Sequence, residues 1–318
     1  MAAKKILVVF GATGNQGGSV IKSILSDPKT AGEFKIRAIT RDPSKPNAQA
    51  LTAKGVECVA ADMNSEHQIK SALQGAHAVF AVTNYWEKMD AELEMKQGRN
   101  IGNLAKECGV QHLIWSSLYD VAKLTGGKFP NVEHFDSKAA VEQHIRDIGV
   151  PATFLMPGFF MSNIPGGAFR QLPPSNHWTL ALPMPADTPI PCFDAGSDTG
   201  KFVKGILTHR EKVLGKRVLA ATDYSTPSDA INIFKELFPK AGENAKFVQM
   251  SKDDYKGALA HAGMPEKIQQ ELYENMAFMN EYGYYGKSSL AESHEILDEK
   301  LTTLKEFFAG AKAFEGLE

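Results

Sequence analysis

A glycine-rich turn near the start of the chain constrains the fold more than any other sequence feature. Phe10–Gly18 reads FGATGNQGG, with glycines at positions 11, 14 and 17. The turn directly follows the apolar run Lys5–Phe10 and opens the helical pattern Gly17–Ser26. A tight passage from strand to helix needs glycine wherever a Cβ would obstruct the backbone. The sequence therefore predicts a strand–turn–helix unit of the kind that begins a nucleotide-binding α/β domain.

The same turn predicts how such a domain holds its ligand. The first N–H groups of a helix have no partner within the helix and lie at the positive end of its dipole, so they attract phosphate. We expect the pyrophosphate of a dinucleotide to lie against the turn and the first helical residues. The expected contact residues are Gly11, Thr13, Gly14, Asn15, Gln16 and Gly17.

Short apolar runs alternate with helical patterns through the first half of the chain. Runs that are apolar on both faces are typical of parallel strands covered by helices. They predict an α/β fold, a doubly wound parallel sheet of the Rossmann type. The expected strands are Lys5–Phe10, Lys35–Ile39, Val56–Ala60, Ala78–Val82, His112–Ser116 and Ala152–Met156. The expected helices are Gly17–Ser26, Pro46–Ala53, Ser65–Leu73, Ala91–Glu107 and Ser137–Asp147.

The pattern changes after Pro157. Residues 157–192 are rich in proline and predict long loops, whereas Lys252–Phe314 is mostly helical. We expect a NAD(P)-binding domain over residues 1–157 and a smaller, mostly helical C-terminal substrate or partner domain over 158–318. Segments around 190–222 are expected to return to the first domain. The aromatic turn Asn280–Gly286 is expected to form a pocket lid or a partner surface. Alternatively, its tyrosines line an apolar pocket or belong to the core between the domains.

Composition excludes several other classes of protein. Lys and Arg total 35 against 37 Asp and Glu, a net charge of −2, so no direct nucleic-acid binding is expected. The three cysteines are far apart, which argues against a disulfide scaffold, and the histidines lack metal-ligand spacing, so no metal is expected. No stretch reaches the ~18 apolar residues of a membrane span. We expect a protein of the cytoplasm, or of cytoplasm and nucleus, without membrane contact.

The end of the second strand bears on which nucleotide is bound. An acidic residue there would pair with the ribose 2′-OH of NAD(H), but this chain has Arg41, with Lys45 shortly after. A guanidinium can hold a 2′-phosphate, so NADP(H) is favoured over NAD(H). Two alternatives stay open: Asp42 could face the ribose, or Arg41 could be a solvated loop charge.

The ends of the later strands complete the expected cofactor wall. These positions meet at the carboxyl edge of a parallel sheet, although each taken alone is also typical of ordinary loops. The adenine is expected near Asp62 and Met63, and the nicotinamide ribose near Val82, Thr83 and Asn84. After the sixth strand, Pro157 and Phe160 are expected to lie against the nicotinamide.

Several of these motifs together resemble the NmrA-like family, atypical members of the extended short-chain dehydrogenase/reductase superfamily. The resemblance rests on Phe10–Gly18, Arg41-Asp42-Pro43, Gly55–Asp62, Ser116-Ser117, Val132–Lys138 and Gly149–Pro157. It points to the branch that includes a fungal nitrogen-metabolite repressor and a vertebrate NADPH sensor. The family implies a Rossmann domain with a smaller C-terminal domain, NAD(P) binding, and either regulation through protein partners or oxidoreductase activity.

The superfamily comparison also implies catalytic residues. Typical members carry Tyr-x-x-x-Lys after a serine that holds the substrate oxygen, and this chain has Ser117 followed by His134 and Lys138. Imidazole can donate a proton near neutral pH, so His134 stands in for the tyrosine while Lys138 holds the ribose. Alternatively, His134 only packs or caps its helix, and Lys138 alone serves the cofactor.

A literal Tyr-x-x-x-Lys occurs elsewhere, at Tyr119 and Lys123. It begins immediately after the serine pair, in a loop, before the helix that should carry it. Tyr119 is therefore an alternative catalytic residue, or a wall of the substrate pocket.

Two classes of function follow. In the first, bound NADP(H) is sensed and not consumed, and its occupancy biases loops that meet a regulatory protein partner. In the second, the chain is an NADPH-dependent reductase of a small apolar carbonyl, imine or quinone. The missing tyrosine favours the first class.

Overall fold

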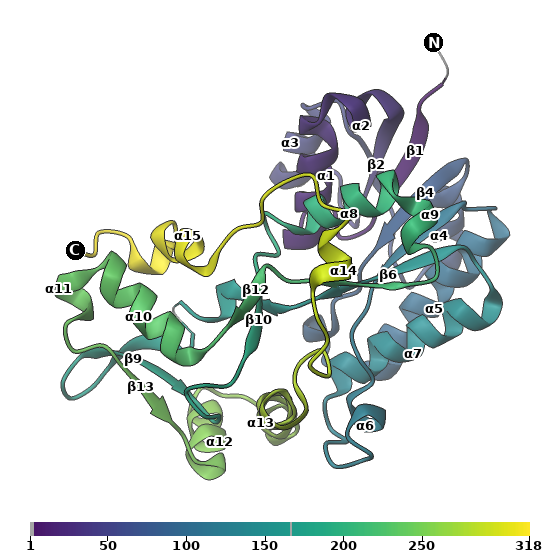
Figure 1. The fold of residues 1–318 in the computed structure, drawn as a ribbon. Coiled ribbons are helices and arrows are strands. Elements are labelled where there is room, and N and C mark those ends of the chain that lie inside the picture. Colours follow the sequence, from purple (N-terminus) through teal and green to yellow (C-terminus); the bar gives the residue numbers. More distant parts are fainter. Residues whose placement is uncertain (1–2, 166) are drawn as a thin grey trace.

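The large sheet of the molecule confirms the predicted doubly wound architecture. The computed structural model describes residues 3–165 and 167–318. Seven strands run in the order β11-β6-β5-β4-β1-β2-β3 (Figure 1), and every neighbouring pair is parallel. The strands are β1 (Lys5–Val9), β2 (Phe34–Thr40), β3 (Glu57–Ala60), β4 (Ala76–Ala81), β5 (His112–Ser116), β6 (Ala152–Pro157) and β11 (Arg217–Ala220).

Helices cover both faces of this sheet, as the apolar runs predict. Along β1, Leu7 and Val9 pack on one face while Val8 and Phe10 pack on the other, the alternation of a strand between two cores. Helices α1 and α8 lie on the first face, and α4, α5 and α7 on the second. The helices of this part are α1 (Asn15–Ser26), α2 (Pro28–Glu33), α3 (Pro46–Thr52), α4 (Glu66–Leu73), α5 (Ala91–Glu107), α6 (Val121–Leu124), α7 (Glu133–Ile148), α8 (Thr199–Thr208) and α9 (Arg210–Val213).

The second half of the chain contributes to the large sheet. Strand β11 pairs with β6 at its edge, and α8 packs along α1. The contact between the two helices is close: a Cβ on Gly200 would lie 2.2 Å from the carbonyl oxygen of Ser19, and the Gly200 N–H donates to Ser19 Oγ at 2.9 Å. The chain thus crosses between its two parts more than once, and the domain boundary at residue 157 stays a prediction.

The rest of the second half forms a smaller region around two three-stranded sheets. One has the order β12-β10-β7 and the other β13-β9-β8. The strands are β7 (Phe159–Phe160), β8 (Phe169–Leu172), β9 (His177–Leu182), β10 (Ile190–Phe193), β12 (Asp223–Ser225) and β13 (Lys246–Gln249). The helices are α10 (Pro227–Leu237), α11 (Pro239–Gly242), α12 (Lys252–His261), α13 (Glu266–Tyr282), α14 (Ala291–His294) and α15 (Leu304–Ala309). Short 3-10 turns are η1 (Tyr85–Glu87), η2 (Met161–Asn163) and η3 (Lys312–Phe314).

The prediction of long loops over 157–192 was wrong, because four short strands lie there. Their pairing depends on distant segments: β9 pairs with β13, and Phe169 and Trp178 pack on Phe234 of α10. Tertiary packing overrides the weak local signal of proline-interrupted strands. The mostly helical character predicted for Lys252–Phe314 is confirmed by α12 and α13.

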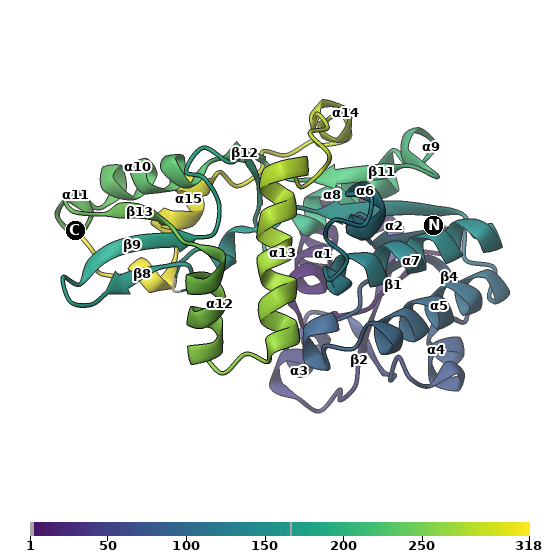
Figure 2. The same cartoon turned by 90° about the horizontal axis from the view of Figure 1, so that it is seen from below.

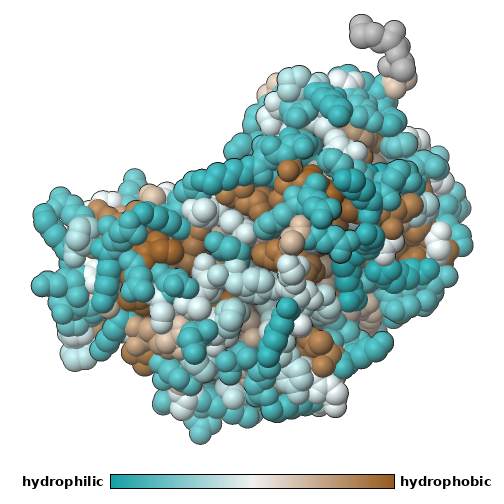
Figure 3. Space-filling view, in the orientation of Figure 1, coloured by the Kyte–Doolittle hydropathy of each residue, from teal (hydrophilic) through white to brown (hydrophobic). Residues whose placement is uncertain are grey.

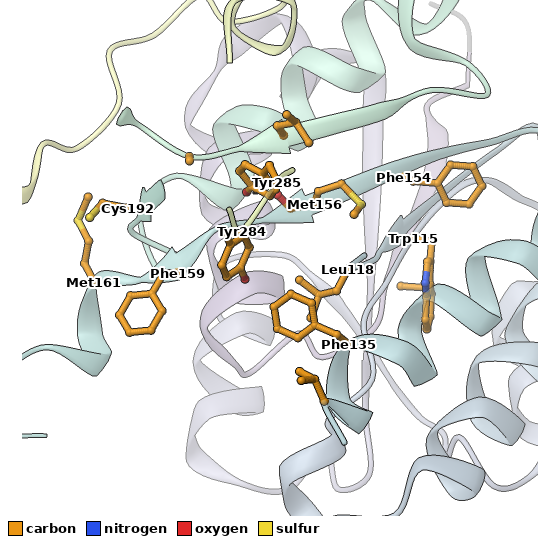
Figure 4. Packing of buried hydrophobic residues seen from close by; sticks show 14 of the residues in the cluster. Trp115, Leu118, Phe135, Phe154, Met156, Phe159, Met161, Cys192, Tyr284 and Tyr285 are labelled. Atoms are coloured by element: carbon orange, nitrogen blue, oxygen red, sulfur yellow. Dashed lines mark hydrogen bonds between the residues drawn. The ribbon is translucent and has the colours of Figure 1, made fainter. Parts of the chain in front are cut away.

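The aromatic turn after α13 is not a lid; the structure agrees with the alternative that its tyrosines are core residues. Tyr284 and Tyr285 are buried, and Figure 4 shows them beside Met156 and Phe135. The Tyr285 hydroxyl donates to the Met156 carbonyl at 2.6 Å, and the Tyr284 hydroxyl donates to that of Pro157 at 3.1 Å. Because buried phenols need hydrogen-bond partners, the turn joins the C-terminal region to the end of β6.

Helix α13 lies between the two parts of the molecule. In the view of Figure 2 it separates β8 and β9 from the helices of the large sheet. On the face drawn in Figure 3, hydrophilic residues predominate, and hydrophobic residues are visible in several groups between them. Within the described residues, no helix has the length and apolar character needed to cross a bilayer.

Candidate functional site

A cleft of about 560 Å³ lies at the carboxyl ends of the strands, where the sheet order reverses between β1 and β4. In doubly wound sheets this is the place where ligands bind. The cleft brings together most of the residues predicted from the sequence. Those lining it are Gly11, Thr13, Gly14, Asn15, Gln16, Gly17, Arg41, Lys45, Asp62, Met63, Val82, Thr83, Asn84 and Phe160. Pro157 and Lys138 do not line it.

The glycine turn forms one wall of the cleft and has the shape of a phosphate cradle. Gly11 has φ +62°, and a Cβ on Gly17 would lie only 2.3 Å from the Gly11 carbonyl oxygen. Gly14 is the N-cap of α1, and no side chain among the described residues caps this helix end. Its first N–H groups therefore stay available to an anion, and the residues present fit the pyrophosphate of a dinucleotide.

Arg41 lies at the rim of the cleft in an ion pair with Glu87 of η1. Arg41 Nη1 is 2.6 Å from Glu87 Oε1, and the Arg41 side chain is 70% exposed. Asp42 is engaged elsewhere: its Oδ1 accepts from the N–H of Ser44 at 2.9 Å and from its hydroxyl at 2.6 Å. These hydrogen bonds lower the pKa of Asp42. The arrangement favours the reading of Arg41 as a phosphate contact over that of Asp42 as a ribose contact.

Asp62, at the end of β3, also holds its own loop. Its Oδ1 accepts from the backbone N–H of Asn64 at 2.8 Å, and its N–H donates to Gln68 Oε1 at 2.8 Å. Met63 lines the cleft beside it. This wall is therefore fixed by local hydrogen bonds before any ligand binds.

A buried polar network lies beneath the part of the cleft wall formed by Thr83. Thr83, at the end of β4, donates its hydroxyl to Glu94 Oε1 at 2.7 Å. The Lys138 ammonium forms an ion pair with the same carboxylate and also contacts Thr83 Oγ1 at 3.3 Å. Lys138 thus reaches the cleft wall through Thr83, with its charge balanced by Glu94.

The two serines after β5 point to different partners. Ser116 Oγ donates to Gln16 Oε1 at 2.8 Å, which ties β5 to the first turn of α1. Ser117, predicted to hold a substrate oxygen, is fully buried and donates to Glu142 Oε2 at 2.6 Å. The structure therefore does not bring the Ser117 hydroxyl to the cleft.

Tyr119 and Lys123 do not form a pair. The Tyr119 ring packs under the Arg217 guanidinium, with 4.7 Å from Cζ to the ring centre, whereas Lys123 is exposed on α6. Neither lines the cleft.

His134 lies behind the cleft, on the first turn of α7. Its Nδ1 is 2.6 Å from Glu271 Oε1 on α13. The same carboxylate accepts the His134 backbone N–H at 2.9 Å and, through Oε2, the Tyr85 hydroxyl at 2.7 Å. Tyr85 lines the cleft, so it connects the cleft wall to this pair. The His134 ring also packs on Trp86, with 4.7 Å between ring centres.

Burial sets the protonation of this pair. It lowers the pKa of His134, although the neighbouring carboxylate opposes that shift. Three donated hydrogen bonds offset the burial of Glu271 and hold the pKa of its carboxyl below the usual value. An ionised carboxylate accepts and cannot donate, so the proton between the two lies on Nδ1 of His134.

Sequence reasoning missed three residues of the site: Tyr85, Glu94 and Glu271. Glu94 could have been found from the sequence, because it lies near the N-terminus of the helix that follows β4. Such a position is close to the end of the strand. Glu271 had none, since it is 137 positions from His134. Within the described residues, no cluster of three or more His, Cys, Asp or Glu side chains could hold a metal ion.

The solved structures similar to this chain share its fold. NmrA, a negative transcriptional regulator, has a TM-score of 0.80 at 22% identity, covering 97% of this chain and 96% of its own. It has also been solved in complex with NADP. The NADPH-dependent quinone oxidoreductase QOR2 of Escherichia coli, solved with NADPH, has a TM-score of 0.76 at 24% identity, with 94% and 97% covered.

Sequence comparison is more specific. The NmrA-like family domain-containing oxidoreductase cpsB of Aspergillus campestris is 31% identical over 303 residues, 90% of this chain and 86% of that protein. An NmrA-like family domain-containing protein of Dictyostelium discoideum is 28% identical over 320 residues, with 96% and 97% covered. The sequence model of the NmrA-like family matches residues 3–308, which confirms the resemblance drawn from the motifs. The chain belongs to the NmrA-like family.

Proposed function

We propose that this protein is an NADPH-dependent oxidoreductase. The observation that carries the proposal is the composition of one continuous cleft. It has an uncapped helix N-terminus, the cationic side chains of Arg41 and Lys45 at its rim, and a tyrosine that leads from the cleft wall to a buried imidazole. Relatives named as oxidoreductases and a neighbour solved with NADPH support the same reading.

Each part of the cleft has a role in holding NADPH. The backbone N–H groups at the start of α1 bind the pyrophosphate. Arg41, with Lys45, binds the 2′-phosphate, because a guanidinium matches phosphate oxygens in charge and geometry. Thr83, supported by Lys138 and Glu94, lies at the end of the cleft that receives the nicotinamide ribose.

The bound cofactor supplies a hydride, and the chain supplies the proton. We assign the proton to His134, whose ring packs against Tyr85 and Trp86 at this end of the site. Trp86 is 40% exposed and offers an apolar wall. A small apolar carbonyl, imine or quinone fits this chemistry, since hydride adds to its electrophilic carbon and the proton to its heteroatom.

A nucleotide-responsive regulator is the second candidate, and one observation favours it. The residue at position 134 is not tyrosine, and the Lys138 ammonium is neutralised by Glu94. NADP(H) would then be bound and not consumed, and a protein partner would distinguish bound from free states. The sequence alone favours this regulator. The buried imidazole beside the cleft is the observation that leads us to prefer the reductase.

The two functions are separated by NADPH oxidation at 340 nm across a panel of carbonyls, imines and quinones. Turnover should fall by about a hundredfold or more in His134→Phe, in line with the loss of an acid–base group, while calorimetry shows NADPH still bound. Absence of turnover in the wild type, with new turnover in His134→Tyr, would favour the regulator. Wild-type turnover unaffected by His134→Phe would remove the role of His134.

A separate variant tests where the pyrophosphate of the cofactor binds. Gly14 has an ordinary extended backbone, and a Cβ there would lie 3.4 Å from the nearest atom, so Gly14→Val should fold. Its branched side chain would stand at the helix N-terminus in the path of the phosphates. We expect binding at least tenfold weaker; unchanged affinity would contradict the placement of the pyrophosphate.

A further inference from the structure

Glu271 reaches across from the C-terminal region to the imidazole of His134. Helix α13 places it fully buried against the first turn of α7, where one carboxylate meets three donors: the Nδ1 and backbone N–H of His134 and the hydroxyl of Tyr85. Three charge-assisted hydrogen bonds at 2.6 to 2.9 Å leave this carboxylate little freedom to turn.

The consequence for His134 is a fixed orientation. The backbone N–H and the ring Nδ1 of the same residue bind the same Oε1, so one oxygen fixes both the backbone and the ring of His134. Phe135 and Trp86 pack against the ring with centres 4.9 and 4.7 Å away. Because Nδ1 carries a proton and donates a hydrogen bond to Glu271, the tautomer of the neutral ring is fixed as well.

The other ring nitrogen is left open. Nε2 of His134 makes no hydrogen bond within the described residues. The His134 side chain is 11% exposed, and its ring packs on the exposed Trp86.

We propose that Glu271 is a positioning residue. It holds His134 with a proton on Nδ1 and leaves Nε2 as the single position at which the ring exchanges a proton with the substrate. This inference rests on the proposed reductase function for its chemical meaning, but the state of the ring can be measured without any substrate.

The proton balance of the step is simple. In reduction, a hydride from NADPH forms the new C–H bond, the carbonyl π electrons move to oxygen, and the Nε2–H of the imidazolium donates its proton to that oxygen. The ring returns to the neutral form with Nδ1–H still bound to Glu271. Solvent then protonates Nε2 again. In the reverse direction Nε2 is the base that takes the hydroxyl proton.

The charge of Glu271 favours the imidazolium that reduction requires, so reduction is faster below the pKa of His134 and slower above it. Other charged or titratable groups surround the ring: Tyr85 from η1 packs on it, and the charges of Lys138 on α7 and Glu94 on α5 act on it. Glu133, the preceding residue, is paired with Lys267 of α13. Glu271 is the carboxylate in direct contact with the ring.

The test uses ¹⁵N NMR of the imidazole nitrogens in the full-length protein, with the His134 signals assigned by their loss in His134→Phe. The wild type should show a protonated Nδ1 at all pH values and a single titration at Nε2. In Glu271→Gln, loss of the carboxylate should move that titration about one unit or more to lower pH. The pH profile of kcat/KM for reduction should move by the same amount.

The matched control is Glu274→Gln on the same helix face. Glu274 is also buried and docks α13 on the segment just before α7, by accepting the N–H of Asn131 at 2.8 Å and its side-chain amide at 2.6 Å, but it makes no hydrogen bond to His134. Its variant should leave the titration of His134 in place. Equal shifts in both variants, or a wild-type ring protonated on Nε2 when neutral, would overturn the proposal. The expected titrations in a protein without turnover would contradict the reductase function and leave the positioning role standing.

Discussion

The two ends of the cleft are built in different ways. At the proposed phosphate end, the candidate binding groups are backbone N–H groups of consecutive residues, shaped by Gly11 and Gly17. At the proposed substrate end, side chains from three separate segments converge, with Tyr85, His134 and Glu271 in contact. The first end is specified by a short stretch of sequence. The second exists only after the C-terminal region has docked.

The largest expected effect lies at the phosphate end. Gly17→Ala places a Cβ 2.3 Å from a backbone oxygen of the turn, so the cradle itself must change shape. We expect NADPH affinity to fall more than a hundredfold, measured by calorimetry. Gly18→Ala is the control, because its Cβ meets only an ordinary 3.6 Å contact and should preserve binding. Equal losses of NADPH affinity in both variants would show that the close backbone contact at Gly17 does not determine binding.

Arg41→Ala tests the rim of the same end. Removing a charged partner of the 2′-phosphate should weaken NADPH binding by about 2 kcal/mol, roughly thirtyfold, and leave NADH binding unchanged. The two affinities can be compared by calorimetry or fluorescence. Parallel losses for both nucleotides would mean that Arg41 does not contact the 2′-phosphate.

Near the substrate end, the stability of the folded protein should depend on pH through a carboxyl group of α7. Burial raises the pKa of Asp136 to about 6, from an ordinary value of 3.8, while its Oδ1 accepts the Val121 N–H at 2.6 Å. Between these values the folded state holds a proton that the unfolded chain has released, so stability declines as the pH rises through the window. Because Asp136 is only half-buried and water screens it, we expect the loss to be about 1 kcal/mol.

Urea unfolding at pH 4.5 and pH 7 checks this. The side chain of Asp136→Asn does not titrate in this range. The difference in stability between the variant and the wild type should therefore shift in favour of the variant from pH 4.5 to pH 7. An identical difference at the two pH values would contradict the raised pKa.

The smallest expected effect concerns Glu87. Its ion pair with Arg41 is exposed and must be broken or shared when a 2′-phosphate binds. Glu87→Gln should therefore tighten NADPH binding by no more than about fivefold. Titration with NADH provides the comparison, since that affinity should not change. Weaker NADPH binding in the variant would mean that Glu87 orients Arg41 for the phosphate.

The contrast between the two ends also explains what could be predicted from the sequence. The turn, the strands and the cleft residues Arg41, Thr83 and Phe160 follow from local patterns and from the rule that strand ends meet. Ser117 was misplaced because its hydroxyl turns to a buried Glu142, and neighbouring serines give no clue to their direction. Glu271 and the buried Tyr285 depend on contacts between residues more than a hundred positions apart, for which one sequence holds no periodic signal.

The packing of α8 on α1 has a consequence for how the protein matures. The helix whose first turn faces the phosphates is covered by residues that are synthesised almost two hundred positions later, with the Gly200 N–H bound to Ser19. Strand β11 completes the sheet edge still later in the chain. A nascent chain that has only just released β6 from the ribosome therefore exposes the apolar face of α1 and an unpaired strand edge, both of which favour aggregation. We expect nucleotide binding to be acquired late in synthesis, and fragments ending near residue 157 to need chaperones to stay in solution.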